Sequence, residues 1–410
     1  MDQTTQHGMR VGSETGQKME PYRDTFESSA DLRKRLIEMR RDLHRIPELD
    51  RDLPKTEAYI KERLSALPCE IIPAGDTGFC AFFQANATGS ATETVAFRSD
   101  MDALPIDEAG DADYRSVHAG RMHACGHDGH MSILLGLASE LARGAGTPRR
   151  NVLLIFQGAE ETTGGAKRIC ESGVLERYNA TRVYGLHLWP GRPKDTIVCR
   201  RNAFMASTMV FRAEIEGRAA HVATYRDGID ALEIGCALVH KVYAMERSEI
   251  APEVFRLLRF GIFQSGRANN VVSDHASLEG SLRTYDEETQ EFLWGRMIGI
   301  AEELMESTGC RIGFSHSDPY PAVINDSALF DEAKAVLTDA GYAFLEPERP
   351  LMVSEDFSWY QRYVPGLFLH LGTGVDTPLH SNDYRIDEDV LLTGVNIFKC
   401  LLNGSPASSR

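Results

Sequence analysis

The segment HMSILLGLASELAR at residues 130–143 and the segment VLLIF at residues 152–156 decide the fold class of this chain. The first segment has its apolar residues at helical spacing, and the second is a continuous apolar run. Such a run is typical of a strand that is buried on both faces of a parallel sheet. Further apolar runs at residues 94–97, 182–186 and 367–371 alternate with helical stretches. This order predicts an α/β domain of three layers with a mostly parallel central sheet.

The pattern changes between residues 203 and 318. The apolar periodicity there predicts strand, helix, strand, strand, helix and strand in turn, at residues 207–215, 229–245, 254–263, 276–284, 287–307 and 311–315. This βαββαβ order is that of a ferredoxin-like α+β domain. We therefore expect an inserted domain at residues 203–318 and a catalytic domain at residues 26–202 and 319–410. Residues 1–25 are polar, and we expect them to be disordered.

The composition is that of a soluble globular protein. The 410 residues suit about two domains. The formal net charge of -16 argues against nucleic acid or an anionic membrane as a partner. No stretch reaches the roughly 18 apolar residues of a membrane span, and the N-terminus lacks the features of a signal peptide. The eight cysteines are irregularly spaced, which is typical of reduced thiols, so a cytoplasmic location is expected.

The densest group of metal-binding residue types is the segment MHACGHDGH at residues 122–130. Cys125 and His127 stand two residues apart, so both side chains can turn towards one point in a looped segment. Thiolate and neutral imidazole are ligands for zinc and similar metals. The alternative is a buried cysteine beside histidines that cap a helix. Metal binding is the interpretation that we favour.

A second group, QGAEE at residues 157–161, directly follows the predicted strand 152–156. Glu160 and Glu161 therefore lie beyond the C-terminal end of a buried strand, where open α/β sheets place their sites. Adjacent side chains point in different directions, so one carboxylate can bind a metal while the other acts on water as a general base. The alternative is an acidic helix N-terminus, which the helix dipole favours, and the pair alone leaves this alternative open.

Two single histidines repeat this placement. His187 follows the predicted strand 182–186, and His380 follows a loop after the predicted strand 367–371. A single histidine is a weak signal, but four separate segments now deliver ligand-type residues beyond strand ends. Five such ligands, one of them bridging, would hold two divalent ions.

The segment RSDMDALP at residues 98–105 also follows a predicted strand. Its carboxylates, Asp100 and Asp102, could orient a ligating histidine by a hydrogen bond to the ring nitrogen that does not bind the metal. The alternative is a solvated acidic loop ahead of a proline turn, and the sequence leaves both open.

Taken together, these motifs resemble the amidohydrolase family that contains hippurate hydrolase, bacterial N-acyl-amino-acid amidohydrolases and the auxin–amino acid conjugate hydrolases. Aminoacylases and glutamate carboxypeptidases are more distant relatives. The resemblance covers nearly the whole chain, from RDLHR at residues 41–45 to the segment around His380, and it includes SEDF at residues 354–357. It implies a catalytic domain with two divalent metal ions and an inserted lid domain that mediates a homodimer. The implied metal ligands are Cys125, His127, Glu161, His187 and His380.

The resemblance also implies which residues act on the substrate. Glu160 would be the general base. His221 in GRAAH would reach the substrate, often across the dimer, and would stabilise the oxyanion of the tetrahedral intermediate. Asn270 and Arg283 match positions expected near the substrate carboxylate.

The chain departs from the family pattern at three places. Position 158 is Gly where the family usually has Pro, and Tyr225 with Arg226 stands where a Pro-His pair is common. Ile46 replaces the second histidine of the usual His-x-His-Pro-Glu stretch. None of these changes removes a ligand or the base, but those after His221 bear on substrate preference.

We therefore predict hydrolysis of the amide bond of a small N-acyl amino acid, which releases a carboxylic acid and a free amino acid. A dipeptidase or carboxypeptidase of the same binuclear chemistry is the runner-up. A non-catalytic metal-dependent binding protein is a third interpretation, and the presence of Glu160 beside all five ligands argues against it. A purely structural role for the cysteine and histidines is the fourth. Zinc or manganese is the expected ion, and cobalt or nickel would also suit these ligands.

Overall fold

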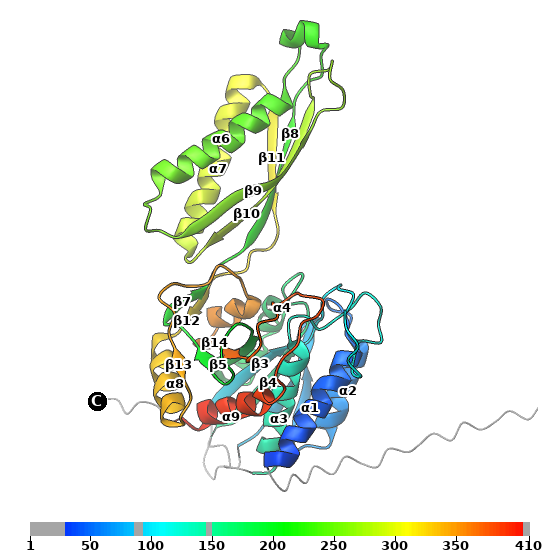
Figure 1. The fold of residues 1–410 in the computed structure, drawn as a ribbon. Coiled ribbons are helices and arrows are strands. Elements are labelled where there is room, and N and C mark those ends of the chain that lie inside the picture. Colours follow the sequence, from blue (N-terminus) through cyan, green and yellow to red (C-terminus); the bar gives the residue numbers. More distant parts are fainter. Residues whose placement is uncertain (1–28, 86–92, 145–149, 405–410) are drawn as a thin grey trace, which may run out of the picture.

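The computed structural model describes residues 29–85, 93–144 and 150–404. Figure 1 shows a layered domain and, above it, an elongated domain of helices packed on strands. The segment at residues 1–25, for which disorder was predicted, lies outside the described residues. Within the described ranges no helix is both long enough and apolar enough to cross a membrane.

The layered domain is built on an eight-stranded sheet with the order β1-β2-β4-β3-β5-β14-β6-β13. The strands are β1 (Glu70–Pro73), β2 (Gly78–Phe83), β3 (Thr94–Asp100), β4 (Asn151–Gln157), β5 (Ala180–Trp189), β6 (Ile197–Val198), β13 (Phe344–Leu345) and β14 (Gly366–Gly372). The four inner strands β4, β3, β5 and β14 pair in parallel. Antiparallel pairing appears further out, where β1 joins β2, β2 joins β4 and β6 joins β14. The prediction of a mostly parallel sheet is confirmed.

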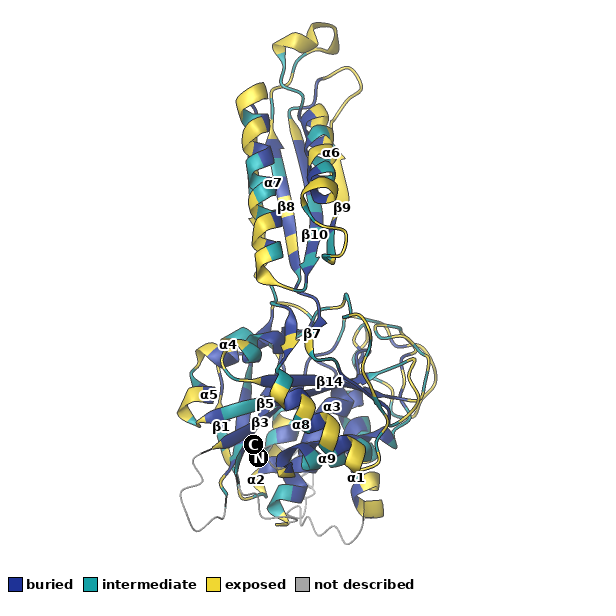
Figure 2. Ribbon diagram, turned by 90° about the vertical axis from the view of Figure 1, so that its left-hand side faces the viewer, coloured by how far each residue is buried: buried dark blue, intermediate teal, exposed yellow. Residues whose placement is uncertain are grey.

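Helices cover both faces of this sheet, which makes three layers. One face packs against α1 (Ser29–Arg45), α2 (Pro54–Ser65), α3 (His127–Ala142), α8 (Ser327–Asp339) and α9 (Val390–Asn403). The other packs against α4 (Gly165–Glu171), α5 (Val174–Arg177) and the 3₁₀ helix η2 (Asp356–Arg362). Strand residues alternate between the two cores, since Leu154 faces the first and Leu153 the second. Both faces are therefore buried, as Figure 2 shows, and this explains the continuous apolar runs.

The inserted domain has the predicted βαββαβ order. Its elements are β8 (Met209–Glu216), the short 3₁₀ helix η1 (Val222–Asp227), α6 (Ala231–Glu249), β9 (Arg256–Ser265), β10 (His275–Thr284), α7 (Glu287–Thr308) and β11 (Arg311–His316). The sheet order is β11-β8-β10-β9, with every pair antiparallel, which is the ferredoxin-like arrangement. Asp230 and Asp286 cap the two long helices, because their carboxylates accept hydrogen bonds from backbone N–H groups of the first turns.

The chain passes between the domains at two adjacent strands. β7 (Asn202–Met205) leads towards the insert and pairs antiparallel with β12 (Val323–Asn325), which lies on the return path. A further antiparallel bridge joins Thr208 to Tyr320. The two crossings therefore lie side by side. The exact limits of the two domains stay a prediction.

Candidate metal centre and active site

A cavity of about 650 Å³ lies between the layered domain and the base of the insert. Residues from both domains line it, among them Cys125, Glu160, Glu161, His187, Arg283, Glu355 and His380. The cavity lies at the C-terminal ends of the parallel strands, where an open α/β sheet places its site. The structure thus brings seven chemically active side chains to one place.

Cys125 and His187 are buried neighbours in this cavity. The Sγ atom of Cys125 lies 3.4 Å from Nε2 of His187. The other ring nitrogen of His187, Nδ1, donates a hydrogen bond to the carbonyl of Leu188 at 2.8 Å, which leaves a lone pair on Nε2. Burial, together with the nearby His130, holds the pKa of His187 well below its usual range. The ring is therefore neutral, as a metal ligand must be.

His187 lies inside a strand rather than after one. The sequence suggested that the strand ends at residue 186, but β5 continues to Trp189. It does so because β14 pairs along it in parallel as far as Gly372, with His370 opposite His187. The interpretation that His187 follows the strand is wrong, although the residue still lies near the C-terminal end of β5.

His127 begins α3 and has one nitrogen to spare. Its Nδ1 donates to the main-chain carbonyl of Asp102 at 2.8 Å. Its Nε2 is buried and has no hydrogen bond within the described part of the chain, and Oε1 of Glu161 lies 3.8 Å away. A buried ring nitrogen without a partner is costly unless a ligand completes it. This orphaned nitrogen fits a metal ion.

Glu161 and His380 form a second pair of donors. Oε1 of Glu161 lies 3.2 Å from Nε2 of His380. Burial alone would raise the pKa of Glu161, but the hydrogen bond from His380 and the charge of His127 lower it below its usual value. His380 has a φ of 62°, which is uncommon for a residue with a side chain. Backbone strain of this kind gathers at functional sites, where surrounding contacts hold it in place.

One carboxylate holds the backbone of both Glu160 and Glu161. The two oxygens of Asp102 accept from the backbone N–H groups of Glu160 at 3.0 Å and Glu161 at 3.1 Å. Ala159 just before them has a φ of 61°, the second strained residue of the site. Loss of solvent and the charges of Glu355 and Glu161 raise the pKa of Glu160 well above its usual range. A carboxylate with a raised pKa is suited to act as a base near neutral pH.

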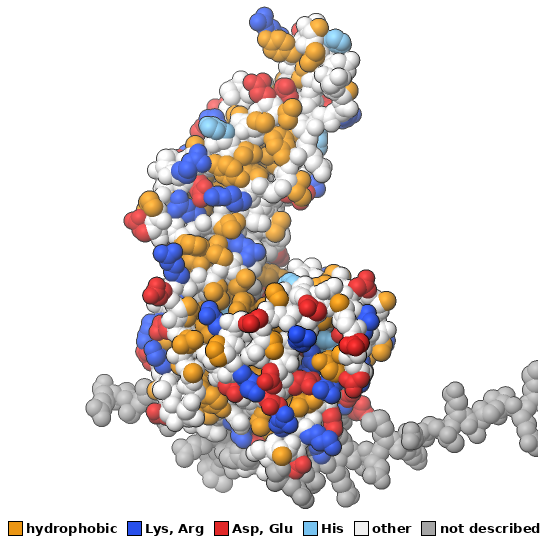
Figure 3. All heavy atoms as spheres, viewed as in Figure 1, with side chains coloured by type: hydrophobic (Ala, Val, Ile, Leu, Met, Phe, Trp, Pro, Cys, Tyr) orange, Lys and Arg blue, Asp and Glu red, His pale blue; other side chains and the backbone are white. Residues whose placement is uncertain are grey.

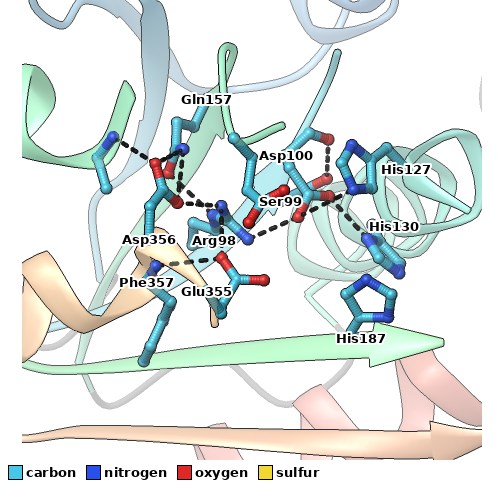
Figure 4. A network of polar contacts seen from close by, with 12 residues as sticks. Arg98, Ser99, Asp100, His127, His130, Gln157, His187, Glu355, Asp356 and Phe357 are labelled. Atoms are coloured by element: carbon cyan, nitrogen blue, oxygen red, sulfur yellow. Dashed lines mark hydrogen bonds and ion pairs between the residues drawn. The ribbon is translucent and has the colours of Figure 1, made fainter. Parts of the chain in front are cut away.

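Asp100 and Asp102 are both buried, with only 1% of each residue exposed. The alternative of a solvated acidic loop is therefore wrong. Asp102 orients His127 through its main-chain carbonyl rather than through its carboxylate. Asp100 accepts a bond of 2.7 Å from Nδ1 of His130, whose Nε2 accepts from the N–H of Leu188. Both nitrogens of His130 are thus occupied, which separates it from the candidate ligands (Figure 4).

Arg98 joins the two sides of the site. Its guanidinium donates to Asp100 at 2.6 Å, to Gln157 at 2.9 Å and to Asp356 at 2.7 Å, and it lies 3.1 Å from Glu355. The sequence did not single out this residue. A signal was present, however, because an arginine inside an otherwise buried strand must find charged partners.

The three residues expected to contact the substrate from the insert are separated. Arg283, near the end of β10, lines the cavity and donates to the carbonyl of Met352 at 2.6 Å. His221 and Asn270 lie together at the exposed far tip, where the N–H of Val222 donates to the carbonyl of Asn270. Figure 1 shows this tip at the end of the insert that is remote from the layered domain. Of these three residues, only Arg283 lies beside the candidate metal ligands of its own chain.

The glycine at position 158 has a local structural reason. Its N–H donates to the carbonyl of Thr77 at 2.6 Å, a bond that the family's usual proline could not make. A Cβ atom at this position would lie 2.8 Å from a methyl group of Leu53. The departure therefore changes how the loop is anchored, while Glu160 and Glu161 remain in the cavity.

Comparisons with known proteins agree with this fold. The model of peptidase family M20/M25/M40 matches residues 96–404. An uncharacterized hydrolase of Staphylococcus aureus strain USA300 is 33% identical over 89% of this chain and 96% of the relative. A protein from methicillin-resistant Staphylococcus aureus has a similar structure, with a TM-score of 0.85 and 27% identity over 91% of this chain and 97% of that one. The Bacillus subtilis YXEP protein, a dinuclear metal-binding peptidase of the M20 family, has a TM-score of 0.79 and 29% identity over 91% of this chain and 98% of its own.

The fold and the donor cluster thus define a metal-binding hydrolase with an inserted α+β domain. This chain belongs to the M20/M25/M40 peptidase family.

Proposed function

We propose that the chain hydrolyses the amide bond of N-acyl amino acids and releases a carboxylic acid and a free amino acid. The observation that carries this proposal is the meeting of metal donors, a base and a cation in one cavity. Cys125, His187 and Glu161 come from three separate segments, and they lie beside Glu160 and Arg283. This combination suits attack by water on an amide whose product carries a carboxylate.

The proposed metal ligands are Cys125, His127, Glu161, His187 and His380. They form overlapping sets, since Cys125, His127 and His187 lie within 4.8 Å of one another, as do the donor atoms of Cys125, Glu161 and His380. Overlapping sets suit two ions that share a ligand. The thiolate favours zinc, while the imidazoles and the carboxylate also suit manganese, cobalt or nickel. Bound divalent ions supply positive charge that lowers the pKa of water and polarises a carbonyl.

Glu160 is proposed as the general base. Its raised pKa lets it take a proton from the attacking water and later give that proton to the leaving amine. Tyr320 supports this placement by donating to the main-chain carbonyl of Glu160 at 3.2 Å. Arg283, across the cavity, would hold the carboxylate of the amino acid in a charge-assisted hydrogen bond.

We further propose that His221 and Asn270 complete the site of a second copy of the chain. They lie at the remote tip and cannot serve the cavity of their own chain in this arrangement. The insert also carries a suitable interface, because β9 is the last strand of its sheet and exposes Ile262 and Phe263. An edge strand with exposed apolar residues is a site for pairing. Figure 3 shows hydrophobic side chains gathered along this domain.

A peptidase is the second candidate, and the family membership favours it. The Bacillus subtilis relative is a peptidase, and the same donors and base would cleave a dipeptide or a C-terminal residue. The two candidates differ in the group that precedes the scissile amide, which is an acyl group in one case and an aminoacyl group in the other.

A hydrolysis screen separates these candidates. The metal-free protein is loaded with manganese or zinc in turn and is given N-acetyl and N-benzoyl amino acids beside dipeptides. We expect faster turnover of the acyl amino acids. Faster turnover of the dipeptides would replace the first proposal by the second, and no turnover of any amide would contradict both.

A further inference from the structure

Glu355 has a fixed oxygen and a free one. The residue is 2% exposed and stands just before η2. Its Oε1 accepts from the N–H of Phe357 at 3.1 Å and lies 3.1 Å from a guanidinium nitrogen of Arg98. Its Oε2 has no hydrogen bond to the part of the chain that the structure describes, and Figure 4 shows it pointing away from Arg98. The carboxyl group is therefore oriented. Burial raises its pKa and the charge of Arg98 opposes that rise, and in the ionised form that Arg98 favours one acceptor is left over.

The next residue, Asp356, shows the contrast. Both of its oxygens are occupied, by the side chain of Gln157, by Arg98 and by the N–H of Ala166. Asp356 does not line the cavity, whereas Glu355 does. The two neighbouring acids therefore differ in role, because Asp356 holds Arg98 and Glu355 faces the space where a substrate would lie.

The carboxyl group of Glu355 is close to the proposed base. Carboxylate oxygens of Glu160 and Glu355 lie within 4.8 Å of each other. An atom that receives a proton from Glu160 is thus within reach of Glu355. The leaving nitrogen of an amide is such an atom, and it carries an N–H in every secondary amide. Because Glu355 lines the cavity, its free oxygen can accept a hydrogen bond from a ligand donor at this point.

We propose that Oε2 of Glu355 accepts the N–H of the scissile amide and holds the leaving nitrogen beside Glu160. No proton is transferred to Glu355 in this role, and Arg98 acts only by orienting it. The contact would make the enzyme select amides that carry an N–H over esters and N-methylated amides. The inference rests on the proposed amidohydrolase function and adds a residue that determines which bond is cut.

The first test uses the unaltered protein with its metals. An N-benzoyl amino acid is compared with its N-methyl derivative, and the free product amino acid is compared as an inhibitor with the matching hydroxy acid. We expect kcat/KM for the N–H amide to exceed that of the N-methyl amide at least tenfold, and the amino acid to inhibit at least tenfold better than the hydroxy acid. Equal rates together with equal inhibition would overturn the proposal.

The second test compares Glu355→Gln with Asp356→Asn on the N-benzoyl amino acid and on its ester analogue. A glutamine keeps the bonds of Oε1 and presents an N–H₂ donor in place of Oε2, which repels an amide N–H and suits an ester oxygen. We expect the amide-to-ester ratio of kcat/KM to fall about 10- to 100-fold, the factor that a hydrogen bond to a charged group contributes. Asp356→Asn disturbs Arg98 without touching the substrate, so it should slow both reactions alike.

The outcomes separate the two proposals. Suppose that the unaltered protein cleaves the amide but Glu355→Gln lowers kcat/KM equally for the amide and the ester. Glu355 then has only a structural role, and this inference fails while the proposed function stands. If the unaltered protein cleaves no acyl amino acid, the proposed function fails first. Metal content and melting temperature are measured for each variant. Should Glu355→Gln be unfolded, the comparison on the unaltered protein decides.

Discussion

The cavity and the tip of the insert form the two halves of the predicted site, and they differ in how far one chain builds them. At the cavity, the neighbouring donors Cys125, His127 and His187 are buried, and each makes a contact within the chain that orients it. At the tip, His221 and Asn270 are exposed and belong to no cluster of metal donors among the residues that the structure describes. The proposed metal ligands and base are therefore brought together in a single chain, whereas we propose that His221 and Asn270 serve the site of a partner copy. Four changes test this comparison.

The largest effect is expected for Glu160→Gln. Without the base, turnover should fall by about 10²- to 10⁴-fold while the metals stay bound. The matched control is the adjacent Glu161→Gln, which removes a proposed ligand and should lower the metal content measured by elemental analysis. Substantial turnover by Glu160→Gln would contradict the role of Glu160 as the base. Unchanged metal content in Glu161→Gln would contradict the role of Glu161 as a metal ligand.

His221→Ala tests the exposed half. If this histidine donates to the oxyanion in another copy, kcat should fall by about 10²-fold, with melting temperature and metal content unchanged. His240→Ala, on an exposed position of α6, serves as the control and should leave kcat as it is. If His221→Ala keeps its activity, His221 at the tip takes no part in catalysis.

Arg283→Met tests the one cation that the insert brings to the cavity. Loss of a charge-assisted bond to the substrate carboxylate should raise KM by about 10- to 100-fold with a smaller change in kcat. Substrates whose carboxylate is converted to an amide should bind equally to both proteins. If KM for the acid does not change, Arg283 does not contact the carboxylate.

The smallest effect is expected on stability. Removal of the metals by a chelator should lower the melting temperature by about 5–10 °C, because an ion that binds only the folded state stabilises it. The same chelator should have a smaller effect on Glu161→Gln, which binds less metal from the start. A melting temperature that is insensitive to the chelator in both proteins would argue against a metal centre.

Most of the fold could be predicted from the sequence, because buried apolar residues recur with the period of a helix or form the continuous run of a buried strand. The apolar run at 152–156 and the alternation of strands and helices led to the parallel sheet, and the change of pattern led to the insert. The end of β5 was missed, because an apolar run does not show how far a neighbouring strand pairs along it. The hairpin of β1 and β2 was also absent from the prediction.

The site was less accessible to sequence reasoning. Residues close in sequence, such as Cys125 and His127, carry their own signal, whereas His380 was found through its likeness to a family. The hydrogen bonds around Arg98 depend on side chains from β3, β4 and η2, which only folding brings together. The separation of Arg283 from His221 has the same cause, since it follows from the length of the strands between them.

The most direct test of a site shared between two copies is a mixed dimer of Glu160→Gln and His221→Ala. Each variant is nearly inactive alone, but in the mixed dimer one cavity would have an intact Glu160 and receive an intact His221 from the partner. Co-expression with two tags and sequential purification isolates this species. The shared site predicts about half of the unaltered activity per dimer, because one of two sites is restored. A mixed dimer no more active than its parents would contradict it.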